Sequence, residues 1–393
     1  MSTSSAAALF APPSTRLPWP GSRSSAIGGW RRWRSTLASL PSLFLLAFAG
    51  LPGQGLAQVG LMQWETPALP RPVTLVYPTE APGRPTAFGP FTLDVAVNAA
   101  PKPGRHRLVV VSHGTAGSPL PDHALAAQLA QAGFVVAQIL HDGDNHLDTR
   151  LAGPDSFRLR PAEAVRAMNA LAADPSWSER LDLSRVGVHG MSAGGVTALS
   201  LAGAQWRTLN LVRHCLAHGE ADEAFCFQGA RTAEQRAERQ ARFDRARFAP
   251  DFVLPAELKA WHGGRGPTQE GEDPRPDPRV ASVTAAVPVG VIFSAESLQR
   301  IRVPVGLVTA RQDGVLVPRF HSGHVLTHCK TCERLIDLPA GHFDVLWPWP
   351  GQIATAVAAQ QWRGGAVTPG FDPALRSAAH DRIVGFHRQH LMR

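Results

Sequence analysis

The sequence predicts an α/β protein in which a mostly parallel central sheet is flanked by helices and carries a cap-like insertion. Short runs that are apolar throughout, typical of strands buried on both faces, alternate with segments of helical periodicity. This alternation favours a parallel sheet covered on both sides. It is interrupted once, over residues 205–278, by a segment of different composition. We therefore expect one large domain over residues 58–393 with an insertion inside it.

The first two strands are expected to form an antiparallel pair. They are "PVTLVYP" (72–78) and "FTLDVAV" (91–97), and the segment between them is rich in proline and glycine. Such a composition favours turns over regular structure, so we predict a connecting loop there.

Three apolar strands and three helices then follow in alternation. The second strand, "FVVAQILH", begins directly after a glycine that ends the helix before it. The expected strands are 107–114, 134–141 and 184–190, and the expected helices are 121–133, 160–174 and 193–204.

The insertion contains two of the four cysteines and a charged helix predicted over residues 231–247. We interpret it as a cap beside the substrate entrance. The sheet resumes after it, and Asp372 with Pro373 marks the start of a closing C-terminal helix over 372–391. The expected later strands are 279–290, 303–310 and 334–339.

Residues 1–57 resemble an export signal. A basic head precedes an apolar stretch over 37–51, and Gly55 and Ala57 provide small residues at the −3 and −1 cleavage positions. We expect cleavage after Ala57, a periplasmic or secreted protein, and no stable membrane anchor after cleavage. An uncleaved anchor is the alternative, although the stretch is short for a membrane span and contains Pro41.

The composition excludes a nucleic-acid-binding role for the mature domain. The formal charge of +8 includes five arginines of residues 1–57, and removing that segment leaves about +3. No basic stripe with interleaved aromatic residues remains. The 44% hydrophobic content instead indicates a packed globular core.

An even number of cysteines in an exported chain permits disulfides. Cys215 and Cys226 are the expected structural pair. Cys329 and Cys332 form a lone C-K-T-C, which is a weak zinc signal. We expect a short local disulfide or two free thiols there.

The segment Gly190-Met191-Ser192-Ala193-Gly194 matches G-x-S-x-G and lies between a predicted strand and a predicted helix. Such a nucleophile elbow needs glycines because strand and helix approach closely, and its helix directs free N–H groups towards the serine oxygen. A glycine-rich turn that binds phosphate or nothing is the alternative, but the spacing is not that of a nucleotide-binding loop. We predict Ser192 as a nucleophile.

Two residues follow in the order that a catalytic triad on such an elbow requires. Asp313 comes directly after the strand "VPVGLVTA", and His342 occupies the loop after the last strand. A turn-forming aspartate and a surface histidine are the competing interpretations. Asp337 and Asp344 are weaker candidates for the acid.

The oxyanion hole is predicted from topology, because backbone donors leave no side-chain signature. The N–H of Ala193 follows the nucleophile, and the second donor is expected in the turn "SHGTAG" (112–117), from Thr115. His113 in that turn is interpreted as a structural brace and not as the base.

Several ordered motifs also carry a family resemblance. "LVYPT", "VVVSHG", "HGMSAGG", "DPRV", "QDG" and "AGHFDVL", over roughly residues 70–350, resemble the platelet-activating factor acetylhydrolase-like and dienelactone hydrolase-related branch of the α/β-hydrolases. The resemblance implies an α/β-hydrolase fold and a serine esterase that needs no cofactor, with Ser192, Asp313 and His342 as triad. Met191 and Ala193 replace the His and Phe common in that elbow, and dienelactone hydrolases proper use a cysteine nucleophile.

The expected function is therefore hydrolysis of small-molecule carboxylic esters through an acyl-enzyme, without metal or other cofactor. Two alternatives remain open: a non-catalytic binding protein on a hydrolase scaffold, and a metal-dependent hydrolase that uses the His- and Asp-rich loop 141–148. The apolar "VLWPWP" beside His342 indicates a partly hydrophobic pocket, without separating lipid from aryl esters. The oligomeric state is left open.

Overall fold

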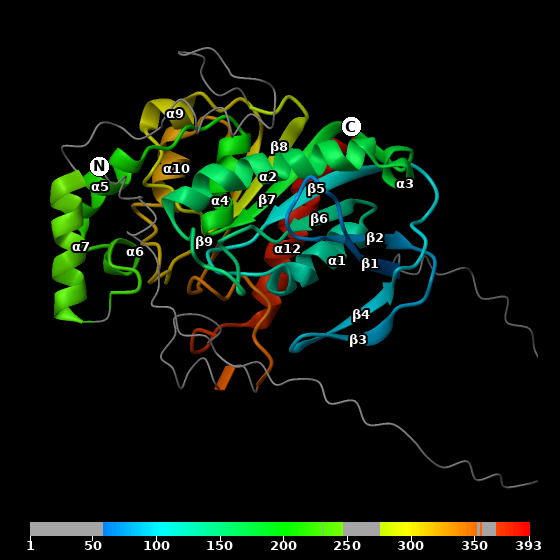
Figure 1. The fold of residues 1–393 in the computed structure, drawn as a ribbon, viewed down its shortest axis with the longest axis horizontal. Helices are drawn as coiled ribbons and strands as arrows, with labels where there is room; N and C mark the ends of the chain where they lie inside the picture. Colours follow the sequence, from blue (N-terminus) through cyan, green and yellow to red (C-terminus); the bar gives the residue numbers. More distant parts are fainter. Residues whose placement is uncertain (1–57, 231, 247–275, 352–353, 356–366) are drawn as a thin grey trace, which may run out of the picture. The chain divides into compact units, whose positions relative to one another are not determined.

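The computed structural model describes residues 58–230, 232–246, 276–351, 354–355 and 367–393. The predicted α/β class is confirmed: a ten-stranded, mostly parallel sheet in the order β10-β9-β8-β7-β5-β6-β2-β1-β4-β3 is flanked by helices (Figure 1). The export segment predicted for residues 1–57 lies outside the described residues. Within the described ranges, no helix is both long enough and apolar enough to cross a membrane.

The strands from β5 to β10 pair in parallel, and β2 joins them antiparallel to β6. The strands are β1 (Gln58–Trp64), β2 (Val73–Thr79), β3 (Arg84–Phe88), β4 (Phe91–Val97), β5 (His106–Ser112), β6 (Val135–Ile139), β7 (Leu181–Met191), β8 (Val280–Ala286), β9 (Val305–Ala310) and β10 (Cys332–Leu338).

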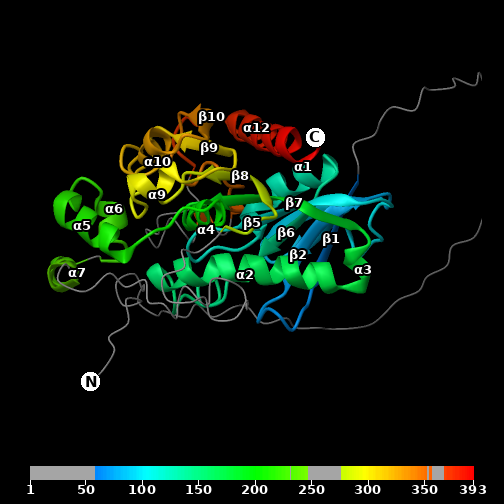
Figure 2. The same cartoon turned by 90° about the horizontal axis from the view of Figure 1, so that it is seen from above.

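The longer helices lie on both faces of this sheet (Figure 2). The helices are α1 (His123–Gln131), α2 (Pro154–Ala173), α3 (Pro175–Ser178), α4 (Ala193–Leu201), α5 (Thr208–His218), α6 (Glu223–Cys226), α7 (Ala233–Ala246), α9 (Ala295–Gln299), α10 (Ser322–His328) and α12 (Pro373–Leu391), with a 3₁₀ turn over Leu120–Asp122.

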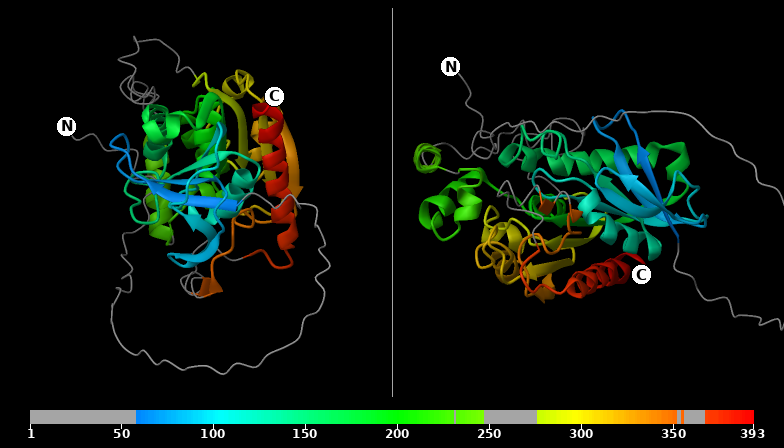
Figure 3. Two further views of the ribbon diagram at one scale, coloured as in Figure 1. Left: turned by 90° about the vertical axis from the view of Figure 1, so that its right-hand side faces the viewer. Right: turned by 90° about the horizontal axis from the view of Figure 1, so that it is seen from below.

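Successive residues of the central strands enter two separate apolar cores. Leu108 and Val110 of β5 pack with the side of the sheet covered by α2 and α4. Val109 and Val111 pack with the side covered by α1 and α12, and Figure 3 shows α12 along the later strands. Side chains alternate between the two faces of a strand, and helices cover both faces, so both sets are buried. This is the physical origin of the strands that are apolar throughout.

The predicted pairing of the first two strands is wrong. β1 lies between β2 and β4, antiparallel to the first and parallel to the second. β1 was not predicted, because it begins directly after the predicted cleavage site. β3 was not predicted either: the Pro- and Gly-rich segment forms an edge strand that pairs with β4. Three of the five β3 residues are exposed and none is buried, so the strand has no apolar face to give a signal, and proline is tolerated at such an edge.

Two helices begin or end at residues other than those predicted. The helix predicted over 160–174 begins at Pro154 and contains Pro161 inside it, with Phe157 buried in the added turns. The charged helix predicted over 231–247 is α7. The C-terminal helix is confirmed, and the side chain of Asp372 accepts from the N–H of Ala374 at 2.9 Å as a cap.

The insertion expected over 205–278 contributes α5, α6 and α7 between α4 and β8, and residues 247–275 lie outside the described part. The structure pairs Cys215 of α5 with Cys226 of α6. It also pairs Cys329 with Cys332, between α10 and β10. Of the two interpretations for the C-K-T-C segment, the local disulfide is the one that the structure contains.

Two glycine-to-alanine substitutions should change stability in opposite directions. Gly385 lies on the exposed side of α12 with open space around it, so Gly385→Ala should stabilise the protein by roughly 0.5–1 kcal/mol through lower unfolded-state entropy. Gly133 follows α1 with φ +97°, which alanine adopts poorly, so Gly133→Ala should destabilise by at least about 1 kcal/mol. Urea unfolding of both variants measures these effects; equal signs would contradict them.

Candidate active site

Ser192 lies on a sharp turn between the end of β7 and the start of α4. Its backbone has φ 55° and ψ −115°, which for a residue other than glycine costs roughly 1–3 kcal/mol. Surrounding hydrogen bonds hold this conformation. The N–H of Ser192 donates to the carbonyl of Ala286 at 3.0 Å, and its carbonyl accepts from the N–H of Val289 at 3.2 Å. The strand-turn-helix context predicted for the motif is therefore present.

The two glycines of the motif are required by close backbone contacts. A Cβ atom on Gly190 would lie 2.0 Å from the carbonyl oxygen of Gly194. A Cβ atom on Gly194 would lie 1.9 Å from the carbonyl oxygen of Ser112, at the end of β5. Real Cβ atoms do not approach backbone so closely, so any side chain would force strand and helix apart.

The three predicted triad residues form one hydrogen-bonded line. The Ser192 Oγ lies 3.0 Å from His342 Nε2, and His342 Nδ1 lies 2.7 Å from Asp313 Oδ2. Asp313 and His342 are buried, with 6% and 4% exposure, while the serine is partly accessible. Residues separated by up to 150 positions are thus brought together at the carboxyl edge of the sheet.

Asp313 uses its two carboxylate oxygens for different purposes. Oδ2 contacts the histidine, while Oδ1 accepts the backbone N–H groups of Val315 and Leu316 at 2.8 and 2.7 Å. The carboxylate therefore caps its own loop and is fixed in orientation by it. We call residues 311–321, between β9 and α10, the acid loop.

The two weaker candidates for the acid have other partners. Asp337 pairs with Arg311 at 3.1 Å. Asp344 accepts from the N–H of Gly341 at 2.7 Å and from that of Thr368 at 2.9 Å, so it shapes the loop that carries His342.

The turn over residues 112–117 lies against the elbow, as the oxyanion prediction requires. A Cβ atom on Gly114 would lie 3.4 Å from the Ser192 Cβ. In the described part of the chain, neither the N–H of Thr115 nor that of Ala193 has an acceptor. The N–H of Ala193 also belongs to the first turn of α4, where the helix dipole favours negative charge.

A buried arginine that sequence analysis missed holds this turn. Arg160 of α2 is 1% exposed and donates to the carbonyls of His113 and Gly114. It also pairs with Asp144 Oδ2 at 2.7 Å, and Asp144 Oδ1 accepts from the N–H of Ala116 at 2.8 Å. Burial alone would raise the pKa of Asp144, but the guanidinium and the hydrogen bonds to the carboxylate together outweigh burial and lower the pKa. Only the tertiary burial of Arg160 reveals this role.

The His- and Asp-rich loop after β6 directs its side chains to separate partners. His141 Nδ1 lies 2.5 Å from Glu163 Oε2, and burial raises the pKa of that carboxyl to about 7. Asp142 and Asp148 both pair with Arg150, while Asp144 faces the guanidinium described above. Four of the five His and Asp side chains of this loop, those of residues 141, 142, 144 and 148, are therefore bound to other side chains of the protein.

The two other histidines near the elbow are structural. His113 Nδ1 contacts the carbonyl of Gly114 at 2.7 Å, and its Nε2 accepts from the backbone N–H of His141 at 3.3 Å. His189 contacts Thr284 Oγ1 at 2.9 Å. These contacts agree with the bracing role expected for His113.

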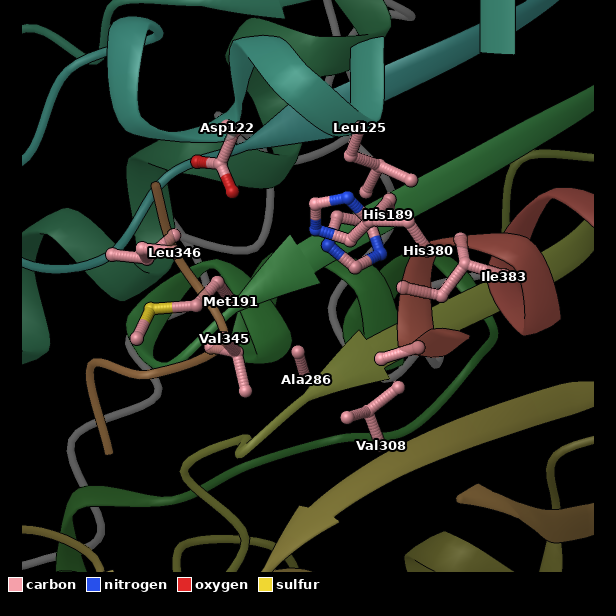
Figure 4. Close-up of a pocket in the computed structure, with 11 residues that line it drawn as sticks. Asp122, Leu125, His189, Met191, Ala286, Val308, Val345, Leu346, His380 and Ile383 are labelled. Carbon is pink, nitrogen blue, oxygen red and sulfur yellow. The ribbon is translucent and has the colours of Figure 1, made fainter. Parts of the chain in front are cut away.

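A small cavity of about 10 Å³ lies behind the elbow and includes no triad residue. Figure 4 shows Asp122 near Leu346 at one side of it, with His189 and His380 beyond Met191. The volume is about that of a single water site. Burial raises the pKa of Asp122 to about 7.

A scan of the sequence against protein-family models finds no matching family, and a search of curated proteins finds no match.

The burial of Asp122 should make stability depend on pH. The folded protein keeps the Asp122 proton to about pH 7, whereas the unfolded chain releases it near pH 4. The folded state therefore binds more protons in this interval, and its stability falls as the pH rises from about 4 to 7. Asp122→Asn removes this loss. The substitution should therefore be more favourable to the free energy of unfolding at pH 8 than at pH 4.5, with a difference on the order of 1–3 kcal/mol.

Urea unfolding at the two pH values measures the difference. Asp381→Asn, at an exposed position of α12, is the matched control and should show no such difference. An Asp122→Asn effect that is equal at both pH values would contradict the prediction.

Proposed function

We propose that this chain is a serine hydrolase with an α/β-hydrolase fold that cleaves carboxylic esters through an acyl-enzyme. One observation carries the proposal: Ser192 Oγ, His342 and Asp313 are linked at 3.0 and 2.7 Å on a strained turn at a helix N-terminus. The chain order of nucleophile, acid and histidine supports the fold assignment, because each follows a successive part of the parallel sheet.

Acylation begins when Ser192 Oγ attacks the ester carbonyl carbon while His342 Nε2 takes its proton. Asp313 Oδ2 holds the Nδ1–H of the imidazole and stabilises the resulting imidazolium. The carbonyl oxygen becomes an oxyanion, and the N–H groups of Thr115 and Ala193 donate to it. The carbon–oxygen ester bond then breaks, and His342 returns the proton to the departing alkoxide, which leaves as an alcohol.

Deacylation repeats these steps with water. His342 Nε2 takes a proton from the water as its oxygen attacks the acyl carbon. The tetrahedral intermediate then expels the Ser192 oxygen, which recovers the proton from the histidine. The products are a carboxylic acid and the starting enzyme, so the cycle requires no cofactor.

The segment that follows His342 in the chain supports an apolar component in the substrate. Trp347 follows the histidine in the chain and is 52% exposed, and its backbone N–H is held by the carbonyl of Pro121 at 2.9 Å. A large exposed aromatic side chain five residues after His342 in the chain offers contact area to an apolar acyl or alcohol part. We therefore propose small-molecule esters with such a group as substrates.

We also propose that the protein acts after export, in the periplasm or outside the cell. The cysteine pairs Cys215–Cys226 and Cys329–Cys332 support this location, because disulfides persist mainly in oxidising compartments. The basic and apolar pattern of residues 1–57 supports it independently.

Ser192→Ala should abolish ester hydrolysis and leave folding intact, because it removes only the attacking oxygen. We expect kcat for a p-nitrophenyl ester to fall on the order of 10⁴-fold or more. Ser200→Ala is the matched control: Ser200 is a buried serine of the same helix whose Oγ has no partner in the described structure. It should retain activity.

Labelling with a fluorophosphonate probe distinguishes the catalytic proposal from a binding protein on the same scaffold. The probe should modify Ser192 in the wild-type protein and in Ser200→Ala, but not in Ser192→Ala. Ester turnover that persists in Ser192→Ala would exclude the mechanism. Absence of both labelling and turnover in the wild-type protein would favour a binding role.

A further inference from the structure

A buried group of three polar side chains joins the insertion to the acid loop. Asp222, which precedes α6, is 0% exposed, and its Oδ2 lies 2.8 Å from both His214 Nε2 of α5 and His321 Nε2 at the end of the acid loop. Its Oδ1 accepts the backbone N–H of Val317 at 3.3 Å. Nothing in the proposed ester chemistry uses this group.

The protonation pattern of His321 is fixed by a backbone contact. The N–H of Gly290 donates to His321 Nδ1 at 3.2 Å, so the neutral imidazole carries its proton on Nε2 and donates it to Asp222. A metal bound at Nε2 would require the proton on Nδ1, where it would face the N–H of Gly290. Histidine ligands normally donate that second N–H to an acceptor. The contacts therefore fit a hydrogen-bonded carboxylate better than a metal ligand set.

Asp222 is held as an ionised acceptor. Burial alone would raise its pKa, but the hydrogen bonds from His214 and His321 outweigh burial and lower the pKa to about 2. The disulfide between Cys215 and Cys226 links α5 to α6 on either side of Asp222, next to His214 in the chain. The carboxylate is thus attached to a cross-linked hairpin of the insertion.

Two carboxylates share the N–H groups of the acid loop. Asp313 accepts those of Val315 and Leu316, and Asp222 accepts the next one, of Val317. Asp222 then binds the loop a second time through His321. The segment that carries Asp313 is therefore fixed from inside by its own carboxylate and from outside by the insertion.

We propose that Asp222 is a positioning residue for the triad: it holds the acid loop so that Asp313 Oδ2 stays directed at His342 Nδ1. This role rests on the proposed serine hydrolase function. It assigns to the insertion a task in catalysis that is separate from covering the substrate. A displacement of the acid carboxylate should impair proton transfer more than substrate binding, because catalytic groups tolerate little misplacement.

The test is Asp222→Asn in the purified full-length chain. Asparagine offers one oxygen, so either the N–H of Val317 or the Nε2–H of His321 would face its amide N–H. We expect kcat for p-nitrophenyl acetate to fall about tenfold while KM stays within about twofold. Asp277→Asn is the matched control, because Asp277 is a carboxylate before β8 that binds Arg279. Its kcat should stay within about twofold of the wild-type value.

A double-mutant cycle separates positioning from a general loss of structure. If Asp222 acts through Asp313, Asp222→Asn should not further slow fluorophosphonate labelling of Ser192 in an Asp313→Asn background. A general structural defect would slow labelling by the same factor in both backgrounds. If Asp222→Asn fails to fold, His321→Asn replaces it: the asparagine oxygen can still accept from Gly290, but the donor to Asp222 is lost. That variant should likewise lower kcat about tenfold while KM stays within about twofold.

Three outcomes would overturn the proposal while the wild-type protein remains active. The first is an unchanged kcat in Asp222→Asn. The second is an equal slowing of Ser192 labelling by Asp222→Asn in the wild-type and Asp313→Asn backgrounds. The third is about one equivalent of divalent metal that copurifies with the wild-type protein but not with Asp222→Asn. An inactive, unlabelled wild-type protein would instead overturn the serine hydrolase function itself, and the positioning role with it.

Discussion

The contact between the backbones of β5, β7 and α4 is the constraint around which the site is built. A Cβ atom at Gly194 would lie 1.9 Å from the carbonyl oxygen of Ser112, so the helix that follows Ser192 touches the strand that leads into the turn over residues 112–117. This approach places the Ser192 turn against the segment that contains Thr115. The strain at Ser192 is tolerated because hydrogen bonds to neighbouring strand ends determine its backbone.

The loops around this point are held by buried aspartates that accept backbone N–H groups. Asp144 does so in the turn over residues 112–117, Asp313 and Asp222 in the acid loop, and Asp344 in the loop that carries His342. Backbone donors that leave a sheet must find acceptors when they are buried, and a charged acceptor gives the stronger bond. The same chemistry thus fixes each loop of the candidate site on a rigid sheet edge.

The central strands were predictable because they are apolar on both faces, a pattern that only doubly covered strands require. The edge was not. β1 pairs with β2 and β4, and β3 pairs with β4, at the side of the sheet where one face or both is exposed. The Pro- and Gly-rich sequence around β3 favours a turn as readily as an edge strand. Because β1 was not predicted, β2 was expected to pair with β4, whereas it pairs with β1. Strand order depends on distant partners that a local pattern does not encode.

The sequence alone predicted Ser192, Asp313 and His342 as a triad, because each follows a recognisable strand in the required order. It also determined the disulfide candidate Cys215–Cys226. The contacts of Arg160 and Asp222 are visible only in the tertiary structure, because the two residues bind loops that lie 46 and 99 residues away in the chain. Their chemistry arises from burial and from the direction of single hydrogen bonds. These are properties of packing between elements, and the residue type alone does not specify them.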